Sequence, residues 1–300
     1  MTDAALPARR RRRPLARAAA GLAELWADGD ALRRAALIVA ALIAAAALLA
    51  PWLAPFEPTD QSLIARLRPP LGFERAREGH LLGTDELGRD MLSRTLFGLR
   101  LTLGLAVLGA TLGLILGGGL GLLAGVAGGR SETGVMALVD VQIAVPFTLI
   151  ALLAVAVFGS TLGVLVIVLG LHGWEQYARI VRGEVLKLRE APFVEAARAA
   201  GAGPGRIALV HILPNLVSPL VVQFTLSLSN IVLLESTLSF LGLGVQPPTA
   251  TLGSMVGVGR DYMPTAPWIV LAPAAAILLV TFAVQILGDW LRDRADVRLR

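Results

Sequence analysis

The chain has 300 residues, of which 55% are apolar and only 16% are charged, and it contains no cysteine. A typical soluble domain carries about 25% charged residues, so this composition excludes disordered and collagen-like chains and argues against an ordinary soluble domain. Disulfides, thiol catalysis and zinc–thiolate sites are excluded as well, because each of them needs cysteine. With a mean hydropathy of +0.70, the chain is predicted to cross a membrane several times.

The net charge is +5, because 27 basic residues outnumber 22 acidic ones. Of the basic residues 26 are arginine and one is Lys187, and they are unevenly distributed along the chain. An arginine run occupies residues 9–13, ahead of the first long apolar stretch. Such a run can bind nucleic acid or anchor the cytoplasmic end of a membrane helix. Because about 20 apolar residues follow, we interpret residues 1–34 as a cytoplasmic tail beside membrane lipid and expect no nucleic-acid partner.

Six apolar stretches predict six membrane helices, since about 20 helical residues cross a bilayer. They cover residues 35–54, 101–127, 141–158, 160–174, 207–234 and 267–287. An even number places both termini on one side. If that side is the cytoplasm, the inner segments hold 19 of the 27 basic residues, as the positive-inside rule requires. The prediction divides the chain into an external segment 55–100, a core 101–287 with five helices, and a cytoplasmic tail 288–300.

Glycine recurs at every fourth position of the second apolar stretch. The glycines are at positions 109, 113, 117, 121 and 125. A row of small residues at this spacing lies on one side of a helix and lets a neighbouring helix approach closely. We therefore predict a helix-packing face along this row.

The sequence lacks the patterns of an energy-converting enzyme. The only lysine, Lys187, has leucine on both sides, so no P-loop of the form G-x-x-x-x-G-K-[ST] can form. The three histidines are far apart in sequence and predict no metal site. Asp140, Glu175 and Glu235 lie near the ends of predicted membrane helices, whereas proton-coupled transporters usually carry acids in mid-membrane. We expect a non-catalytic subunit without a cofactor, driven by another chain.

A predicted cytoplasmic loop, residues 189–214, has the pattern of a short helix followed by a turn. Pro192 suits the first turn of a helix and Gly201 suits its C-terminal cap, which predicts a helix over residues 192–200. Pro204 can begin a second helix, which Pro214 would bend. Several alanines keep the first helix slim enough to lie in a groove of a partner protein.

This loop resembles the EAA loop in permease subunits of bacterial ABC importers. The residues that carry the resemblance are Glu195, Ala196, Ala197, Gly201, Leu213 and Pro214. In that family the short helix docks on the ATPase subunit and transmits its opening and closing. The resemblance implies the same coupling role for these six residues.

Three further stretches resemble dipeptide/oligopeptide permeases of the C type. The first, residues 80–94, is similar to an external motif of that family and contains Gly83, Asp85, Gly88, Arg89, Asp90 and Arg94. The second, residues 235–248, is similar to an external loop and contains Glu235, Ser239, Gly242 and Gly244. The third is residues 287–293. The whole resemblance covers roughly residues 35–296.

The resemblance implies an all-α transmembrane domain of the type I ABC importers, with six membrane helices. It also implies a second, related permease chain, an extracytoplasmic solute-binding protein, and two P-loop ATPase chains that bind ATP and magnesium. The complex would import dipeptides and oligopeptides across the bacterial inner membrane. Nickel or glutathione is an alternative solute within the family. A membrane scaffold whose loop binds a partner other than an ATPase is an alternative of another class.

The two external stretches also have purely structural interpretations. Thr84 or Asp85 could cap an amphipathic surface helix over residues 84–99, in which Asp90 and Arg94 would form an i,i+4 pair. Glu235 could reach out to water, or it could line the solute path together with Ser239. Gly242 and Gly244 could form a turn or part of an outer gate. The sequence leaves these alternatives open.

Overall fold

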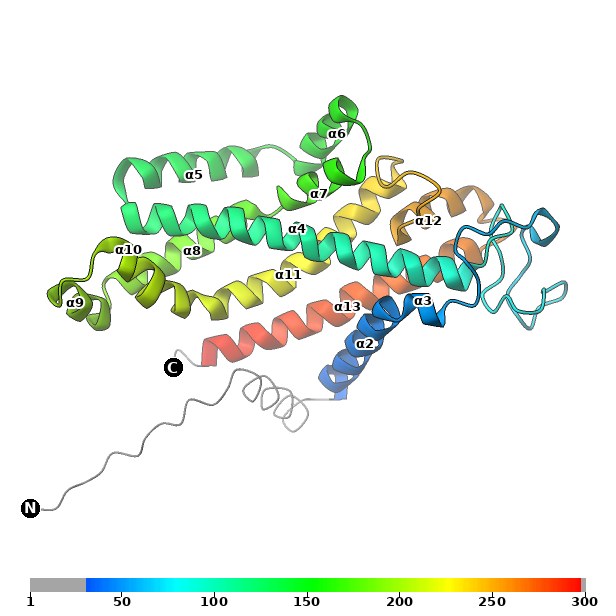
Figure 1. Ribbon diagram of the computed structural model, residues 1–300, viewed down its shortest axis with the longest axis horizontal. Coiled ribbons are helices and arrows are strands. Elements are labelled where there is room, and N and C mark those ends of the chain that lie inside the picture. The colour runs from blue at the N-terminus through cyan, green and yellow to red at the C-terminus, as the bar shows by residue number, and fades with distance from the viewer. Residues whose placement is uncertain (1–30, 298–300) are drawn as a thin grey trace, which may run out of the picture.

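The computed structural model describes residues 31–297, so most of the predicted arginine-rich tail and the last residues of the predicted C-terminal tail lie outside it. Its described elements are helices, which confirms the predicted all-α class (Figure 1). In chain order they are α2 (Ala31–Leu48), α3 (Ala50–Leu53), α4 (Met91–Ala127), α5 (Gly129–Ala144), α6 (Phe147–Phe158), α7 (Leu162–Gly170), α8 (Trp174–Arg189), α9 (Pro192–Ala199), α10 (Pro204–Arg206), α11 (Leu213–Phe240), α12 (Leu252–Gly259) and α13 (Trp268–Val297). Short 3₁₀ turns at Leu63–Ala65 and Arg260–Tyr262 and a π-helical turn at Ile207–Ile212 complete them.

Four helices of the described chain are long and apolar enough to cross a membrane. They are Ala31–Leu48, Met91–Ala127, Pro204–Phe240 and Trp268–Arg294. A fifth crossing results if α5 and α6 act together, although they are bent by 87° at Val145–Pro146. The bend has a local cause, because a residue before proline avoids the helical conformation, and Val145 is extended here.

The stretch at residues 160–174, predicted as the fourth membrane helix, does not form one continuous helix. Its helical part is α7, whose nine residues reach only about 14 Å at 1.5 Å per residue. Gly173, in a left-handed conformation with φ of +84°, separates α7 from the charged helix α8. The described residues therefore contain four or five membrane helices by length and composition, fewer than the predicted six.

The predicted packing face on α4 is confirmed. All five glycines of the row are buried, at positions 109, 113, 117, 121 and 125. A Cβ on Gly117 would lie 2.0 Å from the carbonyl oxygen of Trp174, and one on Gly121 would lie 2.5 Å from that of Ala178. Both distances are below any real van der Waals contact. The backbones of α4 and α8 approach so closely only because these positions lack a side chain.

The same row shows the direction of the chain on both sides of the break after α7. Gly109 lies against Leu169 of α7, and Gly125 lies against Val185 of α8. Residue numbers thus increase together along the two partners, so α7 and α8 follow α4 one after the other and run parallel to it. Figure 1 shows α8 beside α4, directed toward the end of the molecule where α9 lies.

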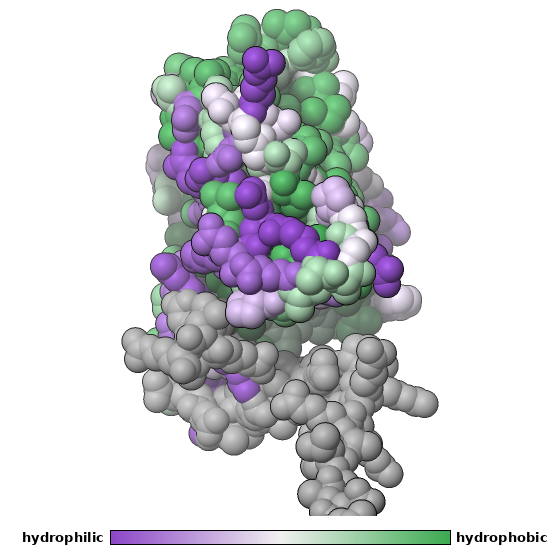
Figure 2. Space-filling model, turned by 90° about the vertical axis from the view of Figure 1, so that its left-hand side faces the viewer, coloured by the Kyte–Doolittle hydropathy of each residue, from purple (hydrophilic) through white to green (hydrophobic). Residues whose placement is uncertain are grey.

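The elongated bundle has two ends, which we call the α9 end and the α12 end (Figure 1). The largest apolar core lies between α4, α7, α11 and α13, and Leu105, Leu169, Leu238 and Val280 are among its buried members. A smaller core at the α9 end joins α8, α9 and the start of the long helix that continues as α11. Figure 2 looks onto this end and shows many hydrophilic side chains gathered there.

We expect Gly117→Ala to destabilise the protein, because its Cβ would overlap the Trp174 carbonyl and push α8 away from α4. Such overpacking costs about 1–3 kcal/mol, measurable as a lower midpoint of thermal unfolding of the purified protein. Gly119→Ala is the matched control, since nothing lies within 4 Å of its added Cβ. Equal midpoints for the two variants would contradict the packing assignment.

Candidate functional site

The short helix α9 has the ends that its sequence predicts. It begins with Pro192 at the first helical position, and Gly201 follows its end with φ of +83°. The amide of Gly201 donates to the carbonyl of Arg198 at 2.9 Å, and the amide of Ala202 donates to that of Ala197 at 3.0 Å. This pair of bonds is a Schellman motif, which suits glycine at the left-handed position. The predicted helix and cap are confirmed.

One side of α9 is held by the protein. Val194 is completely buried and belongs to a cluster with Val181 and Val185 of α8. The same cluster includes Ile212, at the end of the π-helical turn, and Leu216 of α11. Val194 thus packs α9 into the cluster that joins α8 and α11.

The opposite side of α9 is open. Glu195, Ala196 and Gly201 are exposed, and Ala197 is half-buried. The Glu195 carboxylate forms no hydrogen bond or ion pair with any residue that the structure describes. Phe193, 43% exposed, adds an apolar ring to the same short element. The loop thus presents a slim surface with one acid that has no partner within the described chain.

The second helix of the loop begins at Pro204, as predicted, and continues as Pro204–Phe240 through a π-helical turn. In this turn the amide of Leu213 donates to the carbonyl of Ala208, one residue further back than in an α-helix. The turn directly precedes Pro214, which has no amide hydrogen and disturbs the regular pattern. Leu213 and Pro214 are both exposed, at the base of the loop.

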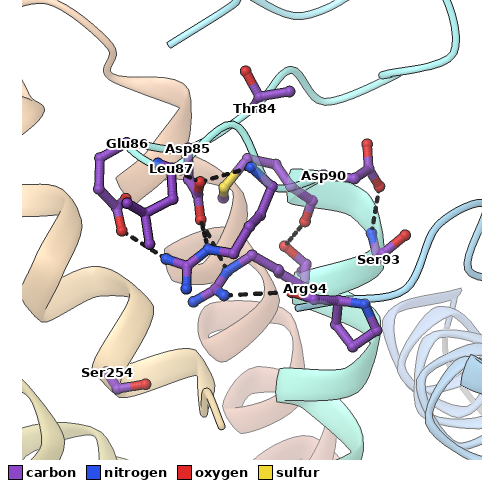
Figure 3. A network of polar contacts seen from close by, with 12 residues as sticks. Thr84, Asp85, Glu86, Leu87, Asp90, Ser93, Arg94 and Ser254 are labelled. Atoms are coloured by element: carbon purple, nitrogen blue, oxygen red, sulfur yellow. Dashed lines mark hydrogen bonds and ion pairs between the residues drawn. The ribbon is translucent and has the colours of Figure 1, made fainter. Parts of the chain in front are cut away.

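At the α12 end, the motif of residues 83–94 is tied together by the buried carboxylate of Asp85 (Figure 3). One oxygen accepts the amides of Leu87 and Arg89, both at 2.9 Å. The other lies 2.6 Å from Nε of Arg89 and 3.2 Å from Nε of Arg94. Arg89 also pairs with Glu86 at 2.6 Å. Two nearly buried guanidinium groups thus share the Asp85 carboxylate.

Asp90, not Thr84 or Asp85, caps the helix in this motif. Its carboxylate accepts the amide of Ser93 at 2.8 Å and lies 2.9 Å from Nδ1 of His80. The predicted Asp90–Arg94 pair is therefore wrong, because Arg94 turns to Asp85 instead. The predicted separate surface helix over residues 84–99 is wrong as well. Met91 is the first residue of the long helix α4, which continues into the membrane region.

Gly83 and Gly88, the two glycines of this motif, are required by the backbone. Both have positive φ values, of +76° and +75°. A Cβ on Gly88 would lie 1.9 Å from the carbonyl oxygen of Ser62, and one on Gly83 would lie 2.5 Å from that of Arg68. These close approaches pack two parts of the long segment between α3 and α4 against each other.

Glu235 does not reach out to water, because its side chain is completely buried. The hydroxyl of Ser239 donates to its Oε1 at 2.6 Å, and that of Thr102 on α4 donates to Oε2 at 3.5 Å. Thr102 accepts the amide of Leu252 at 3.1 Å, and the Thr251 hydroxyl donates to Ser239 at 3.3 Å. Glu235 therefore ties the start of α12 to α4 and α11.

The glycines after α11 have different surroundings. Gly242 has φ of +81° with open space around it, which fits a turn. Gly244 lies so close to Ser239 that a Cβ would be 1.8 Å from its hydroxyl oxygen. The sequence interpretation missed Thr251, and it missed the contribution of Thr102 on α4, which lies 133 residues before Glu235 and 150 residues before Leu252.

Two adjoining hollows lie beside these networks. The first, which we call the polar cleft, has a volume of about 630 Å3 and brings both external motifs together, with Glu86, Arg89, Ser239 and Gly244 in its wall. The second, which we call the apolar groove, has a volume of about 460 Å3 and follows α4 toward α7. Both volumes are in the range of small-molecule sites.

Comparison with known proteins identifies the class. Residues 117–297 match the family described as "binding-protein-dependent transport system inner membrane component". Residues 32–70 match the family described as "N-terminal TM domain of oligopeptide transport permease C". The chain therefore belongs to the inner-membrane components of binding-protein-dependent transport systems.

Several relatives resemble the chain over most of its length. It is 42% identical to the di/tripeptide transport system permease protein DppC of Pseudomonas aeruginosa, over 88% of this chain and 87% of the relative. The dipeptide transport system permease proteins DppC of Escherichia coli K12 and Haemophilus influenzae are 40% and 36% identical, over 88% of this chain and 88% and 90% of the relatives.

A solved structure, described as inward-facing conformations of the MetNI methionine ABC transporter, resembles the fold with a TM-score of 0.53. At 20% identity it covers 68% of this chain and 97% of the other, and it supports the fold alone. By its family, the chain is a non-catalytic, multi-pass membrane permease that works in an ABC transporter complex with an ATPase and a binding protein. The scaffold alternative is thereby excluded.

We expect Asp85→Asn to loosen the α12 end, because it leaves two nearly buried arginines without their shared charge partner. Breaking a buried pair costs about 3–5 kcal/mol. Limited trypsin digestion of the purified protein should then cut faster after the arginines of residues 55–90. Asp60→Asn is the control, since Asp60 is exposed. The central role of Asp85 is refuted if both variants are digested at the wild-type rate.

Proposed function

We propose that this chain is one of two homologous permease subunits in an ATP-driven importer, and that it forms half of the pathway for dipeptides and oligopeptides. The identity of 42% to a di/tripeptide permease over most of both chains supports the choice of solute. Two separate P-loop ATPase chains would bind ATP and magnesium, and an extracytoplasmic binding protein would deliver the solute. Nickel or glutathione remains the alternative solute.

The observation that supports the coupling mechanism is that α9 is packed against the protein on one side and exposed on the other. Its inner side is fixed through Val194, while Glu195 and the neighbouring alanines are open to a partner. A slim amphipathic helix of this kind suits a groove on another protein. When the ATPase chains close on ATP, the groove would move α9. The Val194 cluster would transmit this movement to α8 and α11, and so would switch the pathway between outward and inward opening.

We also propose that α7 and α8 together form one further membrane crossing, the fourth in chain order, which brings the total to six. Their continuous contact with the glycine row of α4, from Leu169 to Val185, supports this arrangement. Six crossings place both termini on one side, and the distribution of basic residues favours the cytoplasm for that side. The α9 end would then face the ATPase chains, and the α12 end would face the binding protein.

We expect Glu195→Lys to reduce the stimulation of ATP hydrolysis by the solute-loaded binding protein while leaving the protein in the membrane, because the exposed side chain supports no contact within the described fold. The measurement is ATPase activity of the reconstituted complex with and without the loaded binding protein. A fall in stimulation of about tenfold corresponds to losing one charge-assisted contact. Glu74→Lys, an exposed charge reversal at the other end of the protein, is the matched control.

Two substitutions of Gly201 distinguish the effect of backbone strain on coupling from the effect of an added charge. Asparagine tolerates a left-handed conformation, and no atom lies within 4 Å of an added Cβ at this position. Gly201→Asn should therefore retain most coupling, whereas Gly201→Asp places a negative charge beside the docking surface and should reduce it. If both the Asp variant and Glu195→Lys imported solute at the normal rate, the docking assignment would be wrong.

The proposed complex and solute are tested by mild solubilisation of native membranes and mass spectrometry of what copurifies with the tagged chain. A second permease and two P-loop ATPases should be recovered, and peptides should be bound to the associated binding protein. Recovery of a nickel-loaded or glutathione-loaded binding protein would replace the proposed solute and leave the importer in place. Recovery of the chain without an ATPase, where a control ABC complex survives, would contradict the proposal.

A further inference from the structure

The polar cleft and the apolar groove adjoin and share part of their lining. Arg94, Pro248, Thr249 and Ala250 line both hollows. These four residues form the boundary between the polar cleft at the α12 end and the groove along α4, and we call the path across this boundary the route. In the proposed orientation this route begins where a binding protein would release its solute.

The groove follows one face of α4. Leu101, Leu105 and Leu108 line it from α4, and Val166 lines it from α7. From Arg94 to Leu108 the helix rises about 21 Å, at 1.5 Å per residue. The route thus extends well into the part of the bundle that the membrane surrounds.

Gly104 keeps this route open. It lies in the groove, it is exposed, and no atom lies within 4 Å of the position that a Cβ would take. A Cβ added here would therefore lie in the groove without touching another atom, and a larger side chain would extend from that point into the groove.

A single unpaired positive charge lies in this apolar surface. Arg100 lines the groove, is exposed, and forms no hydrogen bond or ion pair with the residues that the structure describes. Arg94 nearby is already engaged by Asp85 and by the carbonyl of Pro58. The guanidinium of Arg100 is therefore available for an anion that comes from outside the chain.

We propose that the apolar groove receives the carboxylate end of the transported solute, with Arg100 as its ion-pair partner and the apolar walls as the surface for the solute's side chains. A guanidinium matches a carboxylate with two parallel hydrogen bonds, and its attraction is strengthened beside apolar walls. The inference rests on the proposed function, because a short peptide combines a terminal carboxylate with side chains of variable polarity. Arg100 would then select for a free carboxyl terminus during entry.

The first test measures peptide uptake by proteoliposomes that contain the whole complex, with saturating binding protein. Arg100→Gln should lower the uptake rate about tenfold, as expected for loss of a hydrogen bond to a charged group. Arg100→Lys should restore much of the rate, because it keeps the charge; a purely structural role of the long side chain would not require charge. Arg66→Gln is the control, since Arg66 is exposed and lines neither hollow.

The second test fills the groove. Gly104→Leu should reduce uptake at least as strongly as Arg100→Gln, because the side chain would occupy the route. Gly119→Leu is the matched control on the same helix, where a Cβ also meets no atom and no hollow is lined. Equal uptake by the two leucine variants would overturn the route.

The third test asks what covers the groove, using the chain's natural lack of cysteine. A cysteine introduced at position 104 should react with a water-soluble maleimide in the assembled complex, and transported peptide should slow the reaction. A cysteine that reacts only with a membrane-permeant maleimide would show that lipid or the partner permease fills the groove, and would overturn the proposal.

Failure of this inference is distinguishable from failure of the proposed function. A wild-type complex that imports no peptide would refute the proposed solute. A wild-type complex that imports peptide, with Arg100→Gln and Gly104→Leu variants importing it equally fast, would refute the route alone.

Discussion

Because five positions on one face of α4 carry no side chain, the backbones of α7 and α8 can lie directly against it. In a membrane, where lipid removes the hydrophobic drive for helix association, such close van der Waals packing is a principal source of cohesion. The contact orders the rest of the fold. It directs α8 parallel to α4, brings the end of α8 to the α9 end, and so determines where the loop of α9 emerges. The break at Gly173 is compatible with this contact because the glycine row continues on both sides of it.

The α9 end combines a fixed side with an open side. Val194 holds α9 to α8 and to the long helix of α11, while the surface around Glu195 has no partner in the described chain. The proposed coupling to an ATPase needs both properties, since an element buried on all sides could not receive a partner and a loosely attached one could not transmit force. The Schellman cap at Gly201 ends α9 sharply.

The α12 end follows a different physical logic. Its carboxylates are buried and hold several elements at once: Asp85 holds two arginines, and Glu235 receives hydroxyl donors from two helices. Buried polar groups of this kind are costly unless all their partners are in place, so they fix one arrangement of the surrounding loops. The polar cleft and the apolar groove lie beside the networks of Asp85 and Glu235. In the proposed mechanism, these networks would keep the walls of the solute route fixed, and the movement would take place at the α9 end.

The sequence by itself determined the membrane class, the short helix from Pro192 with its cap at Gly201, and the packing role of the glycine row. These features depend on local composition, on residues with restricted or unusually free backbones, or on the helical repeat, all of which are written in neighbouring positions. The sequence predicted where the helices begin and end less well. The start of α4 at Met91 depends on Asp90 turning to Ser93 and His80, and the division of residues 160–174 depends on a left-handed Gly173.

Only the tertiary structure decided which charges meet. Arg94 pairs with Asp85 rather than Asp90, and Glu235 is buried beside Thr102, more than 130 residues away. It also joined the motifs of residues 80–94 and 235–248 around one cleft, and it left Arg100, in the groove beside that cleft, without an ion-pair partner among the described residues. The physical reason is that ion pairs, buried hydrogen bonds and hollows form between segments brought together by helix packing. A local sequence pattern indicates which charged and polar groups a segment contains, whereas the fold determines which groups of other segments they contact.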